Sequence, residues 1–163
     1  MTRSIVVMGV SGAGKSHIGR ALAQACGLPF LEGDNFHPAD NIAKMQSGHA
    51  LTDADRAPWL AALNQALQEH HARGQAVVLA CSALKAAYRQ QLQQGGVQLR
   101  LVYLQASPER LRQRVEGRRT HFMPASLLQS QFDALEEPSD AIVVDALLPA
   151  DDIIATLLAQ LPS

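Results

Sequence analysis

The sequence lacks the features that mark several classes of protein. Its two cysteines, Cys26 and Cys81, form neither a disulfide framework nor a CxxC metal pair, so we expect both to be buried, reduced thiols. The apolar run at residues 5–8 is far shorter than the roughly 18 residues that a membrane span needs. With 14 Lys and Arg against 15 Asp and Glu, the net charge is −1. Non-specific nucleic-acid binding needs clustered positive charge, so we expect neither a nucleic-acid nor a membrane partner.

Length and composition indicate one globular domain. The chain has 163 residues, of which 47% are hydrophobic and 18% are charged. It shows no repeat, no low-complexity tract and no linker rich in Gly, Ser or Pro. The first residues do not resemble a secretory signal. We therefore expect a single domain over residues 1–163, located in the cytoplasm.

Short apolar segments alternate with segments of helical period. The apolar segments, which we predict to be strands, are residues 4–8, 29–31, 76–81, 99–104 and 141–144. The predicted helices are residues 15–25, 38–45, 52–73, 84–92, 108–116, 124–135 and 149–161. The strands are apolar throughout, as in sheets that are covered on both faces. The expected fold class is α/β, with a five-stranded parallel sheet flanked by helices.

A glycine-rich segment between the first strand and the first helix matches the pattern GxxxxGK[ST] in full. Its residues are Gly9, Val10, Ser11, Gly12, Ala13, Gly14, Lys15 and Ser16. Glycines let backbone N–H groups curl around phosphate oxygens, and the helix N-terminus adds positive potential. Lys15 is expected to reach the β- and γ-phosphates, and the Ser16 hydroxyl to bind Mg²⁺. The motif predicts a P-loop NTPase fold, but GTPase switches, motor ATPases and small-molecule kinases all carry it.

The candidate acceptor site begins after the second strand. Asp34 lies at the carboxyl end of that strand, the edge at which open α/β sheets bind ligands. We expect it to accept a proton from an attacking hydroxyl or to hold the hydration shell of Mg²⁺; the alternative is that it caps the turn before the next helix. Further along, Arg56 can pair with a carboxylate through two hydrogen bonds. Thr52 and Asp55 have the spacing of a capping box, which is the plain explanation for Asp55.

Three more candidates follow the third strand. Ser82 lies just past its end, and Lys85 and Arg89 lie in or near the next predicted helix. We expect Ser82 and Lys85 to face the acceptor. The alternative for Lys85 and Arg89 is a place on a solvated helix face.

Arginines are concentrated in one short part of the chain, at positions 110, 112, 114, 118 and 119. We expect Arg114 to lie flat on an adenine ring and Arg118 to reach the phosphates. Residues 117–124 are predicted to form a lid that closes over the nucleotide and hinges at Gly117. The alternative is a charged helix face exposed to solvent.

Taken together, these motifs resemble the gluconokinase family of small P-loop kinases, which phosphorylate D-gluconate at its 6-hydroxyl with ATP. The matching segments include residues 9–16, 33–38, 51–56, 81–85, 118–124 and 130–132. The resemblance implies a nucleoside-monophosphate-kinase-like fold with an acceptor-binding segment at about residues 34–73 and a lid at about residues 117–124. It also implies ATP and Mg²⁺ as cofactors, 6-phospho-D-gluconate as product, and a homodimer.

The resemblance also implies roles for individual residues. It places Lys15, Arg114 and Arg118 near ATP, and Asp34 and Arg56 near gluconate. We expect Lys15, Asp34 and Arg118 to act in catalysis. The full set expected to bind gluconate is Asp34, His37, Lys44, Arg56, Ser82, Lys85 and Arg89.

Other functions remain open at this stage. Shikimate kinases share the architecture, but they would have a glycine triplet where this chain has Ser82-Ala83-Leu84. A nucleoside-monophosphate kinase would need a longer chain and a second base-binding pocket. A nucleotide-dependent switch would hold ATP without an acceptor, and the polar cluster between Asp34 and Arg89 argues against that class.

Overall fold

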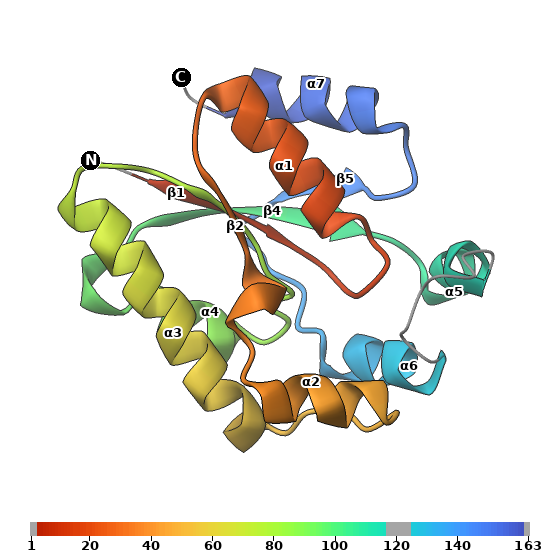
Figure 1. Ribbon diagram of the computed structural model, residues 1–163. Coiled ribbons are helices and arrows are strands. Elements are labelled where there is room, and N and C mark those ends of the chain that lie inside the picture. The colour runs from red at the N-terminus through yellow and green to blue at the C-terminus, as the bar shows by residue number, and fades with distance from the viewer. Residues whose placement is uncertain (1–2, 117–124, 162–163) are drawn as a thin grey trace.

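The computed structural model describes residues 3–116 and 125–161. Within them, five parallel strands form one sheet in the order β2-β3-β1-β4-β5 (Figure 1). The strands are β1 (Ser4–Met8), β2 (Phe30–Glu32), β3 (Val78–Ala80), β4 (Leu99–Gln105) and β5 (Ile142–Asp145). The central strand β1 pairs in parallel with β3 on one side and β4 on the other. The predicted class, an α/β fold with a five-stranded parallel sheet, is confirmed.

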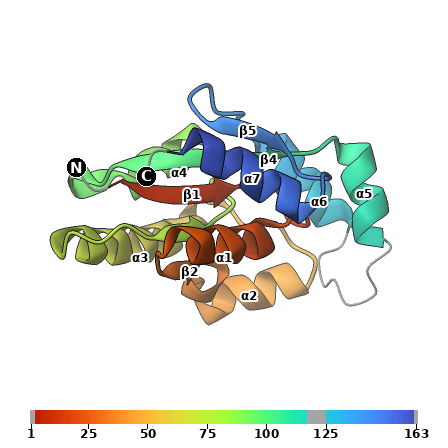
Figure 2. The same ribbon diagram turned by 90° about the horizontal axis from the view of Figure 1, so that it is seen from above.

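Helices connect the strands and cover both faces of the sheet. They are α1 (Lys15–Cys26), α2 (Ala39–Gln46), α3 (Asp53–Ala72), α4 (Ala86–Leu92), α5 (Pro108–Glu116), α6 (Ala125–Ala134) and α7 (Ala150–Gln160), with short 3₁₀ turns η1 (Gly33–Phe36) and η2 (Gln94–Gly96). Their boundaries lie within a few residues of the predicted ones. Figure 1 shows α1 and α7 on one side of the sheet and α3 and α4 on the other. Figure 2 shows α5 and α6 at the end of the sheet opposite to both termini. No helix in the described ranges is long and apolar enough to cross a membrane.

Each face of the sheet has its own apolar core. Leu22 of α1 and Ile153 of α7 pack with Val7 on one face. Trp59 and Leu63 of α3 pack on the other face, in the cluster that holds Val6 and Met8 of β1. Alternate residues of β1 therefore enter alternate cores, and all five residues of the strand are buried.

Two sequence expectations about burial are wrong. β5 is not covered on both faces: it alternates buried and exposed residues, and Val143 is 49% exposed because β5 forms an edge of the sheet. Cys26 is exposed at the last turn of α1, whereas Cys81 is buried as expected. Burial raises the pKa of the Cys81 thiol to about 12, which keeps it protonated.

The local signals at helix ends act as predicted. Thr52 and Asp55 form a complete capping box: the Asp55 nitrogen donates to the Thr52 hydroxyl at 3.0 Å and the Thr52 nitrogen donates to the Asp55 carboxylate at 2.8 Å. Gly27 ends α1 in the left-handed region, with a φ of 68°. These caps fix where α1 ends and where α3 begins, and α3 carries much of the candidate acceptor site.

Candidate active site

The phosphate-binding loop lies between β1 and α1, as its motif predicts. Gly14 precedes α1 with a φ of 94°, a left-handed conformation that glycine adopts without strain. Gly9, at a φ of 152°, passes so close to β4 that an added Cβ would lie 3.0 Å from the carbonyl oxygen of Leu104. Both glycines are therefore required by the path of the loop, which points the first backbone N–H groups of α1 toward the carboxyl edge of the sheet.

Lys15 lies at the base of this loop. Its Nζ donates to the carbonyl oxygen of Val10 at 3.1 Å, which folds the side chain back along the loop. Burial lowers the pKa of the Lys15 ammonium, and the carboxylates of Asp34 and Glu32 oppose this shift. A cation held in a partly dry site beside the loop is well placed to oppose phosphate charge.

The residues around Ser16 fit a magnesium ion. The Ser16 hydroxyl donates a short hydrogen bond to the carboxylate of Glu32, so α1 and the end of β2 bring two hard oxygen groups together. Mg²⁺ prefers such ligands and usually keeps several waters, so one hydroxyl and one nearby carboxylate suit it. Ser16 is the one residue that the sequence predicted to bind the metal, and Glu32 was missed. The position of Glu32 at the carboxyl end of a strand was the signal for it.

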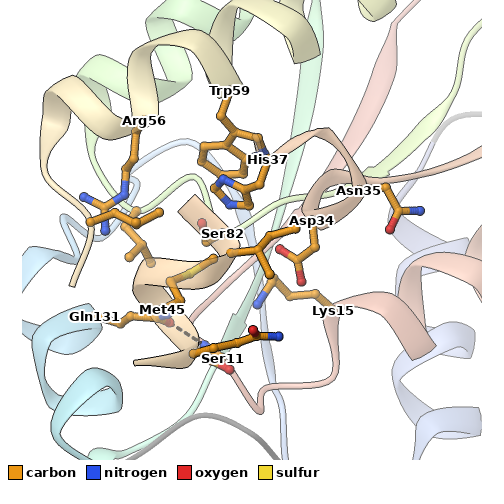
Figure 3. Close-up of a pocket in the computed structure, with 14 residues that line it drawn as sticks. Ser11, Lys15, Asp34, Asn35, His37, Met45, Arg56, Trp59, Ser82 and Gln131 are labelled. Carbon is orange, nitrogen blue, oxygen red and sulfur yellow. Dashed lines mark hydrogen bonds between the residues drawn. The ribbon is translucent and has the colours of Figure 1, made fainter. Parts of the chain in front are cut away.

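A cavity of about 310 Å³ opens beside the loop (Figure 3). Six of the residues expected in the site line it: Ser11, Lys15, Asp34, His37, Arg56 and Ser82. They come from the phosphate loop, η1, the turn that follows it, α3 and the end of β3, segments far apart in the sequence. Three other expected residues, Lys44, Lys85 and Arg89, do not line the cavity.

Asp34 lies in η1, exposed at the cavity. The alternative role as a helix cap is not supported, because Pro38 occupies the position before α2 and no side chain caps that helix. Figure 3 shows the Asp34 carboxylate beside the Lys15 side chain. The structure thus places a carboxylate and the loop lysine on the same side of the cavity.

Trp59 and His37 form one wall. Their rings stack with centroids 4.2 Å apart and planes 13° apart. The Trp59 indole donates to the carbonyl oxygen of Gly33 at 2.8 Å, which fixes the stack to η1. Burial lowers the pKa of His37; Asp34 raises it and Arg56 lowers it further. Trp59 is 1% exposed and belongs both to the apolar core and to the wall of the cavity.

Arg56 reaches the cavity from the first turns of α3 and is held by Tyr88 of α4. Its Nη1 donates to the Tyr88 hydroxyl at 2.9 Å, and its guanidinium carbon lies 5.4 Å from the centre of the Tyr88 ring. The Tyr88 hydroxyl in turn donates to the Asp53 carboxylate, which also accepts from Lys85 at 3.1 Å. Hydrogen bonds from Tyr88 and then from Lys85 lower the pKa of Asp53. Lys85 therefore belongs to the network behind Arg56.

Lys44 and Arg89 are engaged away from the cavity. Lys44 donates to the Asp55 carboxylate at 2.6 Å, an ion pair that joins α2 to α3. The guanidinium of Arg89 is buried and donates to three backbone carbonyls, those of Ala83 at 2.7 Å, Leu84 at 3.2 Å and Glu136 at 2.9 Å. Arg89 thereby joins α4 to the segment after α6. Neither the acceptor-facing role nor the solvated alternative describes it.

Two arginines of α5, Arg110 and Arg114, contact the end of β5 or the segment that follows it. The Arg114 Nη1 donates to the carbonyl oxygen of Ala146 at 3.1 Å, and its Nη2 would be 3.8 Å from a Cβ placed on Gly14. Arg114 therefore spans from the loop to the segment after β5. Arg110 lies 3.9 Å from the Asp145 carboxylate. Arg118 and the predicted lid at residues 117–124 lie outside the described residues.

Two more residues of the site lie in segments that the sequence singled out, the acceptor-binding segment and residues 130–132, but neither was in the set expected to bind gluconate or ATP. Asn41 of α2 is buried and joins His37 to the backbone of Asp55. Gln131 of α6 lines the cavity, and its side-chain oxygen accepts from the Ser11 nitrogen at 2.6 Å, the dashed line in Figure 3. Each residue matters through contacts across the fold, which spacing along the chain does not reveal.

Known proteins of similar sequence and structure identify the family. A family model described as AAA domain matches residues 5–138. A gluconokinase from Gluconobacter oxydans (strain 621H) is 49% identical over 85% of this chain and 78% of its own length. The crystal structure of a gluconokinase from Sinorhizobium meliloti 1021 superposes with a TM-score of 0.85 at 48% identity, over 96% of this chain and 90% of that one. The shikimate kinase of Aquifex aeolicus, at a TM-score of 0.67 and 13% identity over 96% and 94% of the two chains, shares the fold alone. The chain belongs to the gluconokinase family.

Proposed function

We propose that this protein is a gluconokinase that transfers the γ-phosphoryl group of ATP to the 6-hydroxyl of D-gluconate, giving 6-phospho-D-gluconate and ADP. The observation that carries the proposal is the shared cavity. The loop lysine Lys15, the carboxylate of Asp34 and the guanidinium of Arg56 line one space of about 310 Å³. A nucleotide switch needs no such space next to its phosphates, whereas a kinase for a small acid does.

On the donor side, the backbone N–H groups of residues 9–16 would hold the phosphates, and Lys15 would oppose their charge as it shifts during transfer. Ser16, with Glu32 beside it, would hold Mg²⁺, which would neutralise part of the phosphate charge when bound. Arg114, positioned over Gly14, would contact the nucleotide. Arg118, which lies outside the described residues, would reach the phosphates, as the family resemblance implies.

On the acceptor side, Arg56 would pair with the gluconate carboxylate, which orients the chain so that its far hydroxyl approaches the phosphate. Asp34 would accept the proton of that hydroxyl as the oxygen attacks phosphorus and ADP leaves. His37 and Ser82 would bind the remaining hydroxyls. Lys85 would act through Tyr88 and Asp53 on Arg56, while Lys44 and Arg89 would hold the walls of the site.

One assay separates this function from its alternatives. ADP release would be followed with gluconate, shikimate, AMP or no acceptor, using Lys15→Met to subtract any contaminating kinase. We expect ADP release only in the reaction that contains gluconate as the acceptor. Release that needs no acceptor would indicate a switch or ATPase, and release with shikimate or AMP would assign another kinase class.

We also propose that the enzyme is a cytoplasmic homodimer, a prediction that follows from the family resemblance. Light scattering behind size-exclusion chromatography measures the mass directly. A mass of one chain of 17.5 kDa at micromolar concentration would contradict the dimer.

A further inference from the structure

The side-chain nitrogen of Asn41 makes two contacts that together decide the state of His37. This nitrogen donates to the backbone carbonyl of Asp55 at 2.8 Å and lies 3.2 Å from Nδ1 of His37. Asn41 is 5% exposed, so these contacts are shielded from water. They join α2 to the first turn of α3 and to the turn that carries His37.

The Asp55 carbonyl fixes which way the Asn41 amide points. A carbonyl oxygen only accepts, so the group 2.8 Å from it must be the NH₂ and not the side-chain oxygen. The reversed amide would place two oxygens against each other in a buried position. The orientation of the Asn41 amide therefore follows from which groups can donate a hydrogen bond and which can only accept one.

That orientation assigns the protons of the imidazole. The amide nitrogen has two hydrogens, of which one serves the Asp55 carbonyl and the other points to Nδ1 of His37. Nδ1 must then present a lone pair, so a neutral His37 carries its proton on Nε2. Charging the ring would add a proton at Nδ1, directly against the Asn41 hydrogen.

The ring is also fixed in place. It stacks on Trp59, whose indole nitrogen is itself tied to the Gly33 carbonyl. Nε2 has no hydrogen-bond partner within residues 3–116 and 125–161, and His37 lines the cavity. Figure 3 shows the His37 ring beneath Trp59, with Arg56 on one side and Asp34 on the other.

We infer that His37 is a permanently neutral donor that binds an oxygen of the acceptor through Nε2–H, and that Asn41 is the positioning residue that locks this tautomer. The identity of the acceptor, a polyhydroxy acid, rests on the proposed function; the tautomer does not. Because Nε2 already carries a proton, His37 cannot take one from the attacking hydroxyl at that atom. Among the carboxylate and imidazole groups that line the cavity, this leaves Asp34 as the base.

The charges around the ring agree with this state. Arg56, on α3, faces His37 and disfavours a second positive charge, while Asp34, on η1, favours one. The Asp55 carboxylate behind Asn41 is already paired with Lys44 and with the Thr52 nitrogen. Burial is the largest influence on the pKa of His37 and lowers it.

The tautomer is measurable without any activity. Long-range ¹⁵N–¹H correlation spectra of the intact protein should show His37 protonated at Nε2 and bare at Nδ1 throughout about pH 6–8. Asn41→Ala should release the ring to exchange between tautomers. The matched control is Asn64→Ala, which removes another buried asparagine of similar bonding, one whose amide donates to the Leu92 and Gln94 carbonyls outside the cavity. An Nδ1–H tautomer, an imidazolium at pH 7, or equal spectra from Asn41→Ala and wild type would overturn the assignment.

Substitutions of His37 test the donor role. The amide nitrogen of His37→Gln can reach the position of Nε2, whereas that of His37→Asn reaches only the position of Nδ1, and both variants lose the stack on Trp59 equally. We expect KM for gluconate to rise about tenfold more in His37→Asn than in His37→Gln, with KM for ATP unchanged. Equal KM values, or a loss confined to kcat with a shifted pH profile, would overturn the donor role. Were gluconate not a substrate at all, the proposed function would fail while the spectra still decided the tautomer.

Discussion

The side-chain oxygen of Gln131 accepts a hydrogen bond of 2.6 Å from the backbone nitrogen of Ser11, and so joins α6 to the phosphate loop. Backbone N–H groups of such loops are the groups that bind phosphate oxygens. Gln131 also lines the acceptor cavity. One side chain thus touches both the loop that would hold ATP and the space that would hold the acceptor.

Gln131→Glu should weaken ATP binding. The carboxylate keeps an oxygen opposite Ser11 but adds negative charge where phosphate must approach, so we expect the dissociation constant for ATP to rise roughly tenfold. Gln131→Leu removes the oxygen without adding charge and should leave ATP affinity equal or higher. Titration calorimetry on both variants checks this; equal weakening in the two would contradict the charge argument.

Lys15→Met should abolish phosphoryl transfer and leave the fold at least as stable. Burial lowers the pKa of Lys15, which means that the folded state disfavours the charged form. Removing that charge while keeping the side-chain length therefore should not lower the melting temperature. Turnover and thermal unfolding are measured on the same preparation. Near-normal turnover from the folded variant would remove Lys15 from the mechanism.

Asp34→Asn should lower kcat by about 10²–10⁴-fold with a modest change in KM for gluconate. The variant keeps the shape of the side chain and loses the group that accepts the proton. Asp40→Asn, on the exposed first turn of α2, is the matched control and should keep its activity. Retention of wild-type kcat in Asp34→Asn would leave the reaction without the base assigned here.

Tyr88→Phe should raise KM for gluconate about fivefold, because Arg56 loses the hydroxyl that holds its guanidinium at 2.9 Å. The ring remains, so packing is preserved. Tyr103→Phe, in β4 and in the same apolar core as Trp59, tests for a general effect of losing a tyrosine hydroxyl. An equal KM change in both variants would argue against a specific action on Arg56.

Stability should fall at acid pH through Asp55. Hydrogen bonds from Lys44 and then from the Thr52 nitrogen lower the pKa of Asp55 from 3.8 to about 2 in the folded state. The contribution of Asp55 to the free energy of unfolding is therefore complete above pH 3.8 and is lost as the pH falls from 3.8 to about 2. Asp55→Asn should show a flatter dependence of unfolding free energy on pH across that window. If the curves of Asp55→Asn and of the wild type ran parallel, the folded state would not lower the pKa of Asp55.

The parts of the fold that were predictable from sequence are those decided by neighbours in the chain. The loop motif, the Thr52 capping box and Gly27 each act within a few residues, and each lies where its pattern placed it. The apolar runs predicted the strands correctly for the same reason, since each strand is a short continuous segment. Cys26 shows the limit: its exposure depends on which side of α1 meets the sheet in the last turn.

The candidate site was predictable only in part, because the contacts of side chains such as Lys44 and Arg89 depend on which groups the fold brings close to them. Lys44 finds Asp55, and Arg89 finds the carbonyl of Glu136, 47 positions away in the chain. Asn41 lies in the predicted acceptor-binding segment, but the sequence does not show which groups its amide contacts. Its importance comes from a carbonyl of α3 on one side and an imidazole on the other.

Helix α2 differs from the other walls of the cavity in how it is attached. Its one buried residue is Asn41, and within the described ranges none of residues 39–46 belongs to the apolar cores. Asn41 and Lys44 instead bind it to Asp55. Such an element can open without disturbing the sheet, so its amide hydrogens should exchange at a lower free energy than those of β1. Met45 of α2 also lines the cavity. An acid bound in the cavity would therefore protect the amide hydrogens of α2 from exchange more than those of the sheet. The exchange rate of this one short helix would then report the occupancy of the acceptor site.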